Sequence, residues 1–275
     1  LQKRFEKLWV NKMTTQTLNS GEHVFEFEVK DHANLNLNFN ENTHGTYILK
    51  VSGQGECHLN IDFKENSRWI FLWLNQSHDA LNIKEYVRIH ENTTIKMNYG
   101  ELTGGDHKKT SVYEFKGTDT HLDVKGASVI TKGLNWDLKA LHHAKRSFAN
   151  LDNHAIVLED GTLNLEVTGQ IDKGYSGSET HQITRVMNFG SKVDAVVFPK
   201  LLIDENDVSA SHAATVGKPN EEHIYYLQAR GITRQAALKL LMKGYLLPIV
   251  EDIDNETIKN ELIKEIEMKV ESQWT

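Results

Sequence analysis

The residue best placed for chemistry is His212, in the segment SHAAT at residues 211–215. It lies between a strand-like stretch at residues 201–203 and the start of a helical tail. A neutral imidazole is a competent ligand for iron. No Cys, Asp or Glu stands at a ligand-like spacing around it, so other ligands would have to come from elsewhere. The alternative is a structural histidine whose ring nitrogens bond to nearby backbone.

The other candidates for chemistry indicate structural roles. His142 and His143 are adjacent, so in a strand they would face opposite sides and could not chelate one ion. We expect both on a polar outer face. Cys57 alternates in phase with apolar neighbours, which predicts a core residue rather than a reactive thiol. Adjacent carboxylates in loops do not show the convergence that a glycosidase needs. There is no phosphate loop and no serine or cysteine nucleophile motif, so we expect a protein that is not an enzyme.

Composition narrows the classes of protein further. The chain has 275 residues and a formal net charge of −7, which argues against a general nucleic-acid binder. Its single cysteine forms no internal disulfide and cannot supply the thiolates of a protein-only iron–sulfur or structural zinc site. No apolar run has the length of a signal peptide or a membrane span. We therefore expect a soluble, cytoplasmic protein, and the initial Leu indicates a fragment of a longer one.

Hydrophobic periodicity predicts strands over most of the chain. Apolar residues alternate with polar ones at 25–29, 35–39, 57–63, 95–99, 134–138 and 163–167. Early runs begin roughly every 10 to 14 residues, a rhythm typical of a sandwich or of a solenoid of stacked strands. Long polar faces and the absence of a Greek-key connection favour a parallel β-helix. All three prolines lie at or beyond Pro199, which fits an almost unbroken sheet before it.

The pattern changes to helices near residue 216. Asn220 is expected to cap a helix that stops at Gly231, and Thr233 to cap a second that ends at Gly244. Asn255 is expected to cap a third helix, with an apolar stripe at Ile258, Leu262, Ile266 and Val270. Three short helices cannot bury much surface alone. They must dock on the strands or on another protein.

Two blocks carry a resemblance to a known family. DVSASHAATVG at 207–217, followed by EHIYYLQARGI at 222–232, resembles the SufB/SufD family of iron–sulfur cluster assembly proteins. Upstream, LLI at 201–203 and QIT at 182–184 also fit. The match covers about the final quarter of the chain.

The resemblance implies a mainly β fold, with a right-handed parallel β-helix at 1–215 and a small α-helical subdomain at 216–275. Within the first part, roughly residues 1–20 are expected to be irregular. It also implies a scaffold complex of the SUF system. In it, the end of the β-helix pairs with a second SufB/SufD-type protomer, and the helical subdomain binds the ATPase subunit SufC. His212 would lie at the protomer interface where the nascent cluster forms, and the partner would contribute the cysteine.

Two departures make the chain SufD-like. SufB-like members have Glu after the histidine, where this chain has Ala213, and a Cys-Asp pair in a preceding strand, whereas this chain has only Cys57. We therefore expect no cofactor bound by this chain alone, and a transient iron–sulfur cluster only in the complex. Members of the family usually carry an N-terminal helical region as well, which we expect to be missing or cut away here.

The sequence thus predicts a non-catalytic scaffold subunit that pairs with a SufB-like or an identical protomer and binds neither nucleic acid nor membrane. Tyr225, Tyr226, Leu246 and Leu247 are candidates for docking the ATPase, because they supply more apolar area than a small tail can bury. The alternative is that they pack on the β-helix. A competing hypothesis for the whole chain is a secreted-type parallel β-helix enzyme that acts on polysaccharide.

Overall fold

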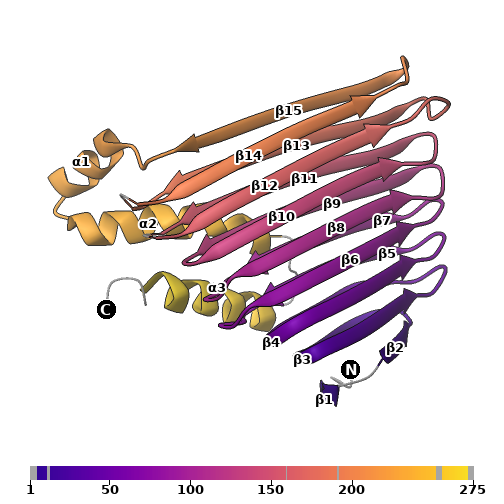
Figure 1. Cartoon of the computed structure of the whole chain (residues 1–275), viewed down its shortest axis with the longest axis horizontal. Helices are drawn as coiled ribbons and strands as arrows, with labels where there is room; N and C mark the ends of the chain where they lie inside the picture. Colours follow the sequence, from indigo (N-terminus) through magenta and orange to yellow (C-terminus); the bar gives the residue numbers. More distant parts are fainter. Residues whose placement is uncertain (1–4, 11–12, 159, 191, 252–255, 272–275) are drawn as a thin grey trace.

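The chain folds as a β-solenoid of about 7 turns, seen in the computed structural model of Figure 1, and this confirms the predicted fold class. The structure describes residues 5–10, 13–158, 160–190, 192–251 and 256–271. The strands are β1 Phe5–Val10, β2 Met13–Leu18, β3 Gly21–Phe39, β4 His44–Phe63, β5 Arg68–Asn75, β6 Leu81–Ile89, β7 Thr94–Glu101, β8 His107–Phe115, β9 Thr120–Ile130, β10 Gly133–His142, β11 Ser147–Val157, β12 Thr162–Ile171, β13 Ser178–Asn188, β14 Asp194–Ile203 and β15 Val208–Gly217. They are followed by α1 Glu221–Ala229, α2 Arg234–Leu246, a 3₁₀ turn η1 Leu247–Val250, and α3 Glu256–Glu271.

Parallel pairing throughout rules out the sandwich. Two stacks of strands rise from β4, one running β6-β8-β10-β12-β14 and the other β5-β7-β9-β11-β13-β15. The long strand β4 starts both, because its first half pairs with β5 and its second half with β6. Each further turn of chain adds one strand to each stack. Successive turns are 24 residues apart at Asn36 and Asn60 and 30 apart at His181 and Ser211.

The core is the space between the two stacks. Because neighbouring strands are parallel and in register, inward side chains of successive turns lie above one another in columns. The rings of Phe39 and Phe63, one turn apart, stack with centroids 4.4 Å apart. Cys57 is buried in this core as predicted, and burial raises the pKa of its thiol to about 12.

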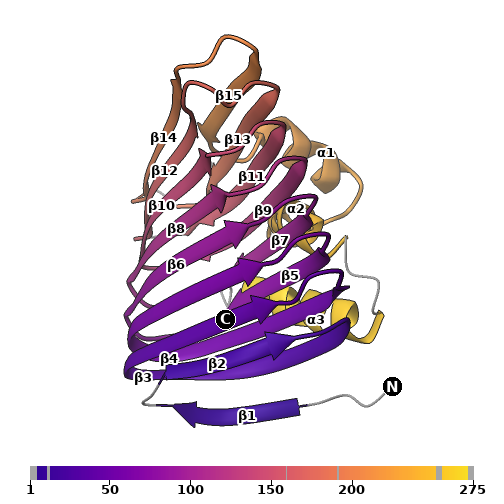
Figure 2. The same cartoon turned by 90° about the vertical axis from the view of Figure 1, so that its right-hand side faces the viewer.

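The first residues differ from the expectation of an irregular segment. β1 pairs in parallel with residues 24–29 of β3, and β2 pairs with residues 34–39 of the same strand. The reason is that β3 is a long strand whose second edge would otherwise remain unpaired. Figure 2 shows β1 at the base of the stack.

The first two helices begin where the sequence predicts. The Asn220 side chain accepts a hydrogen bond from the Glu222 N–H at 2.8 Å, and Thr233 accepts one from the Ala236 N–H at 3.2 Å. α2 does not end at Gly244 but continues to Leu246. Burial of Leu246 offsets the cost of about 1 kcal/mol for glycine inside a helix. In the third helix Ile266 is buried, whereas Asn255 and the side chains of Ile258, Leu262 and Val270 lie outside the described residues.

The tail is docked along one flank of the solenoid (Figure 2). A second apolar cluster joins the β5-β7-β9-β11 stack to α2, η1 and α3, and its tail members are Met242, Leu246, Val250 and Ile266. Helix α1 lies apart from this cluster and buries only Ile224. No helix among the described residues is both long and apolar enough to cross a membrane.

Candidate functional site at the open end of the solenoid

The last turn of the solenoid, at the top of Figure 1, consists of β14 and β15. Each has one neighbouring strand, β12 for β14 and β13 for β15, and these pairs end the strand order. Within the described part of the chain, the outer edges of both strands are therefore unpaired. An uncovered strand edge presents backbone donors and acceptors that another chain can pair with.

His212 lies at an inward-facing position of β15, but it is exposed. Its register partner on β13 is Gln182, whose side chain is 2% exposed and belongs to the interior. His212 inherits the same direction because side chains alternate between the two faces of a strand. No further turn among the described residues covers it, and the His212 side chain is exposed. Among the described residues, no hydrogen bond or ion pair to this ring is found.

His181 lies one strand away from His212, and the sequence interpretation missed it. Its Nδ1 is 2.7 Å from Ser211 Oγ, and its Nε2 is 3.4 Å from Glu179 Oε2. This ring is on the outer face, opposite in direction to His212, so the two histidines cannot hold one ion. No group of three or more His, Cys, Asp or Glu side chains in the described residues is placed to bind a metal. On the inward face of this end, the described residues therefore offer one imidazole, that of His212.

Apolar side chains surround the open end. Val193, Ala195 and Val197, in and just before β14, pack half-buried against the core. On the outer face of the same strand, Phe198 is 53% exposed and Leu202 is 52% exposed. Large apolar side chains beside an unpaired strand edge are typical of a surface that another protein covers.

The candidate docking residues of the tail divide into two pairs. Tyr225 and Tyr226 on α1 are 74% and 56% exposed, and the Arg230 guanidinium lies 4.8 Å from the centre of the Tyr226 ring. Leu246 is fully buried, and Leu247 packs half-buried against the same cluster. The structure thus brings the tyrosines to the surface and places the leucines between the tail and the solenoid.

A buried ionic cluster inside the solenoid is a second feature that sequence reasoning missed. Lys109 Nζ lies 2.7 Å from Glu101 Oε1, with side-chain exposures of 0% and 1%. The ring centroids of Trp73, Tyr99 and Trp136 lie 4.4, 4.1 and 4.6 Å from the ammonium. Period-two alternation places Lys109 on the inward face, but alternation alone does not say that a lysine there stays buried.

Glu85 extends this cluster. It accepts hydrogen bonds from Tyr99 Oη at 2.9 Å and from Ser111 Oγ at 2.7 Å. Burial raises the pKa of its carboxyl, and the nearby Lys109 opposes that rise. The cluster lies several turns below His212 and is separate from the open end.

The expectation for His142 was wrong. Its side chain is fully buried, stacks on Phe115 with centroids 4.5 Å apart, and has Nδ1 2.7 Å from Ser147 Oγ. Burial lowers the pKa of this imidazole to about 4. His143 is half-buried on the outer face, as expected, with Nδ1 2.9 Å from Glu114 Oε1. The two adjacent rings do point in opposite directions.

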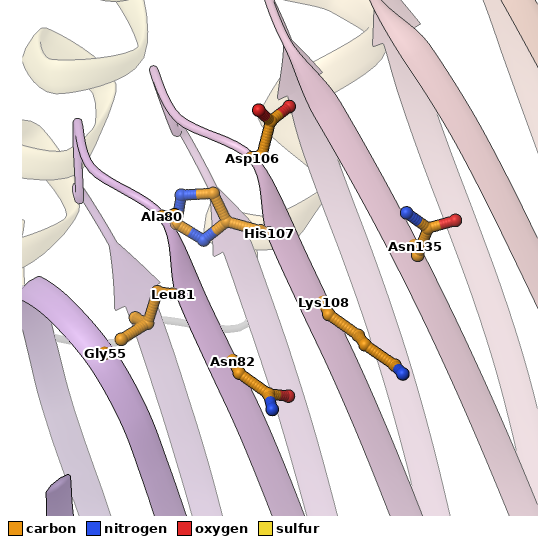
Figure 3. Close-up of a pocket in the computed structure, with 8 residues that line it drawn as sticks. All are labelled: Gly55, Ala80, Leu81, Asn82, Asp106, His107, Lys108 and Asn135. Atoms are coloured by element: carbon orange, nitrogen blue, oxygen red, sulfur yellow. The ribbon is translucent and has the colours of Figure 1, made fainter. Parts of the chain in front are cut away.

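A pocket of about 400 Å³ lies over the starts of β6 and β8. Figure 3 shows the residues that line it. Burial lowers the pKa of His107, which forms part of its wall and has Nδ1 3.3 Å from Asn75 Nδ2. The side chains of Asp106 and Lys108 point away from each other (Figure 3), so no charged groups converge there. This cavity is three strands from β14 and is separate from the open end.

Comparisons with known proteins identify the family to which the sequence is similar. The family model "SUF system FeS cluster assembly, SufBD core domain" matches residues 29–245. The iron–sulfur cluster assembly protein SufD of Bacillus subtilis is 32% identical over 182 residues, which are 66% of this chain and 38% of that protein. A SufBD family protein of Pyrococcus horikoshii is 24% identical over 181 residues, 65% of this chain and 39% of the relative. SufD of Escherichia coli is 35% identical over 68 residues, 25% of this chain and 16% of that protein.

The chain thus spans less than half the length of these relatives. They are named for iron–sulfur cluster assembly and not for polysaccharide cleavage, which favours a role in cluster assembly over the polysaccharide alternative.

Proposed function

The chain belongs to the SufB/SufD family, and from that premise we propose that it is a non-catalytic scaffold subunit of a SUF-type iron–sulfur cluster assembly complex. The observation that carries the proposal is the placement of His212. It is exposed at an inward position of the last turn, between two unpaired strand edges. A ligand held at this position by a second chain would be enclosed by the two chains together.

In this proposal the open end pairs with a second SufB/SufD-type protomer, either SufB-like or identical. The partner covers the edges of β14 and β15 and the exposed Phe198 and Leu202. Strand edges supply backbone hydrogen bonds, and the apolar side chains supply contact area. Such a partner also removes the aggregation hazard of two free parallel edges.

His212 then acts as a ligand of the nascent cluster, which is the cargo of the complex. Neutral imidazole binds iron, and one imidazole leaves most coordination positions to other donors. Cys57 cannot serve as one, since it is buried and its pKa is raised to about 12. The thiolate ligand therefore comes from a cysteine of the partner, as the resemblance to SufD-like members implies.

The ATPase partner docks on α1 through Tyr225 and Tyr226. These rings are exposed, whereas Leu246 and Leu247 hold the rest of the tail on the solenoid. α1 starts at Glu221, close after β15 ends at Gly217. A movement of α1 driven by ATP would therefore pull on the strand that carries His212.

The test is co-expression with SufB- and SufC-like partners, comparing the wild type with His212→Ala. We expect the variant to fold and assemble but to contain less iron and acid-labile sulfide per complex. The matched control is His181→Ala, which removes a ring one strand away on the opposite face. Equal cluster content in His212→Ala and the wild type would remove His212 from the mechanism, and loss of folding would indicate a structural role.

A further inference from the structure

The column of inward side chains that ends at His212 is apolar until its last members. Register places one side chain of each turn in it, and in order these are Met97, Val124, Leu151, Gln182 and His212. Gln182 is 2% exposed, so water does not solvate it. A buried amide is costly unless its polar atoms are bonded. Closeness to the surface therefore does not explain why a polar side chain lies directly under His212.

One of the two polar atoms of the Gln182 amide has a hydrogen-bond partner. Its Nε2 donates across the interior to the backbone carbonyl of Lys200 on β14, at 3.0 Å. Because a carbonyl accepts only, this contact fixes which end of the amide is nitrogen. The Oε1 atom is buried without a hydrogen-bond partner among the described residues. This oxygen is therefore a buried acceptor to which no described group donates.

Gly169 on the opposite stack makes room for this arrangement. A Cβ there would lie 3.1 Å from Gln182 Nε2 and 2.5 Å from Thr180 Oγ1. The interior at this level is therefore shaped around polar side chains of β13. The level above it holds His212 and Leu201, which pair with Gln182 and Gly169 respectively.

We propose that Gln182 is a positioning residue for His212, an inference that depends on the function proposed above. When a partner covers the open end, the imidazole turns inward and donates one ring N–H to Gln182 Oε1. Adjacent strands are about 4.8 Å apart, so the two side chains are direct neighbours. A neutral imidazole has one donor and one acceptor nitrogen. Fixing the donor leaves the other nitrogen free to bind iron, as second partners of metal-binding histidines commonly do.

The test uses the co-expressed complex and Fe²⁺ as the probe, titrated against a chelator. Gln182→Met keeps the length of the side chain and removes its hydrogen bonding. We expect it to assemble but to bind Fe²⁺ about 10–100-fold more weakly. Gln182→Glu retains an acceptor oxygen and is expected to restore most of the affinity, which a merely structural residue would not do.

The matched control is Thr184→Val, a buried polar residue at the next inward position of β13, paired with Ala214 rather than with His212. It should bind Fe²⁺ like the wild type. Wild-type affinity in Gln182→Met, beside a loss in His212→Ala, would overturn this inference and leave the proposed function intact. Wild-type affinity in His212→Ala would instead overturn the proposed function. If Gln182→Met does not assemble, the same titration is carried out with Gln182→Asn. Its side chain is one methylene shorter, so its amide oxygen is withdrawn from His212, and the same outcomes apply.

Discussion

Replacing Lys109 with Met is expected to lower the free energy of unfolding by about 3 kcal/mol, within the range of about 3–5 kcal/mol for breaking a buried ion pair. The loss arises because the Glu101 carboxylate, 1% exposed, remains in the interior without its cation. An ion pair on the surface would contribute about 1 kcal/mol or less. The depth of the pair therefore decides the size of the effect.

Two kinds of contact determine where the expected loss falls within that range. Three aromatic rings face the ammonium within 4.6 Å, and desolvated cation–π contacts are worth about 2 kcal/mol or more. Against this, Asn75 Nδ2 still donates to Glu101 Oε2 at 2.8 Å after the substitution. That remaining hydrogen bond keeps the expected loss near the lower limit.

Urea denaturation followed by tryptophan fluorescence measures the change, since Trp73 and Trp136 contact the ammonium. The control is Lys108→Met on the same strand, an exposed side chain whose loss should cost within about 0.5 kcal/mol. The double variant Lys109→Met with Glu101→Gln removes both charges of the ion pair and should recover more than half of the loss. A cost of less than about 1 kcal/mol for Lys109→Met would refute the argument from burial.

Two further predictions concern buried titratable groups. The pKa of His142 is about 4 when folded and about 6.5 when unfolded, so only the unfolded chain takes up its proton as the pH falls between these values. This residue therefore removes about 3 kcal/mol of stability between pH 7 and pH 4, and His142→Gln should show a correspondingly shallower loss in denaturation curves across that range. A slope identical to the wild type would contradict the assignment. For Cys57, burial holds the thiol protonated, so a thiol reagent at pH 8 should leave the native chain unlabelled and modify it in denaturant. Rapid labelling of the native chain would show that this part of the core opens.

The architecture was predictable because it rests on local patterns. Period-two alternation identifies the strands, and the polar turns between them recur at intervals that suit a coil. Asn220 and Thr233 are caps that act within three residues of themselves, so their roles could be read directly. The continuation of α2 through Gly244 was missed because it depends on burial of Leu246 against distant strands.

The contacts of the interior polar groups were not predictable, because they depend on residues that are distant in the sequence. Alternation says which residues share a face, but not whether a lysine or histidine on the inward face finds a partner there. Lys109 is satisfied by Glu101, which lies on the other stack. In the same way, Gln182 lies under His212 only because that turn is 30 residues long. Earlier turns are as short as 24 residues, so spacing alone could not set the register.

The fold consists of a central body whose strands are paired on both edges and an end that is held by fewer contacts. Strands β5 to β11 each have two neighbours and enclose the ionic cluster, and α2, η1 and α3 are packed on them. β15 has one neighbour, and α1, which follows it, buries a single apolar side chain. Elements that bind or move come from the least stable part of a structure. In the proposed complex, a force on the tyrosines of α1 would reach β15 through residues 218–220, and His212 is one of the inward side chains of that strand.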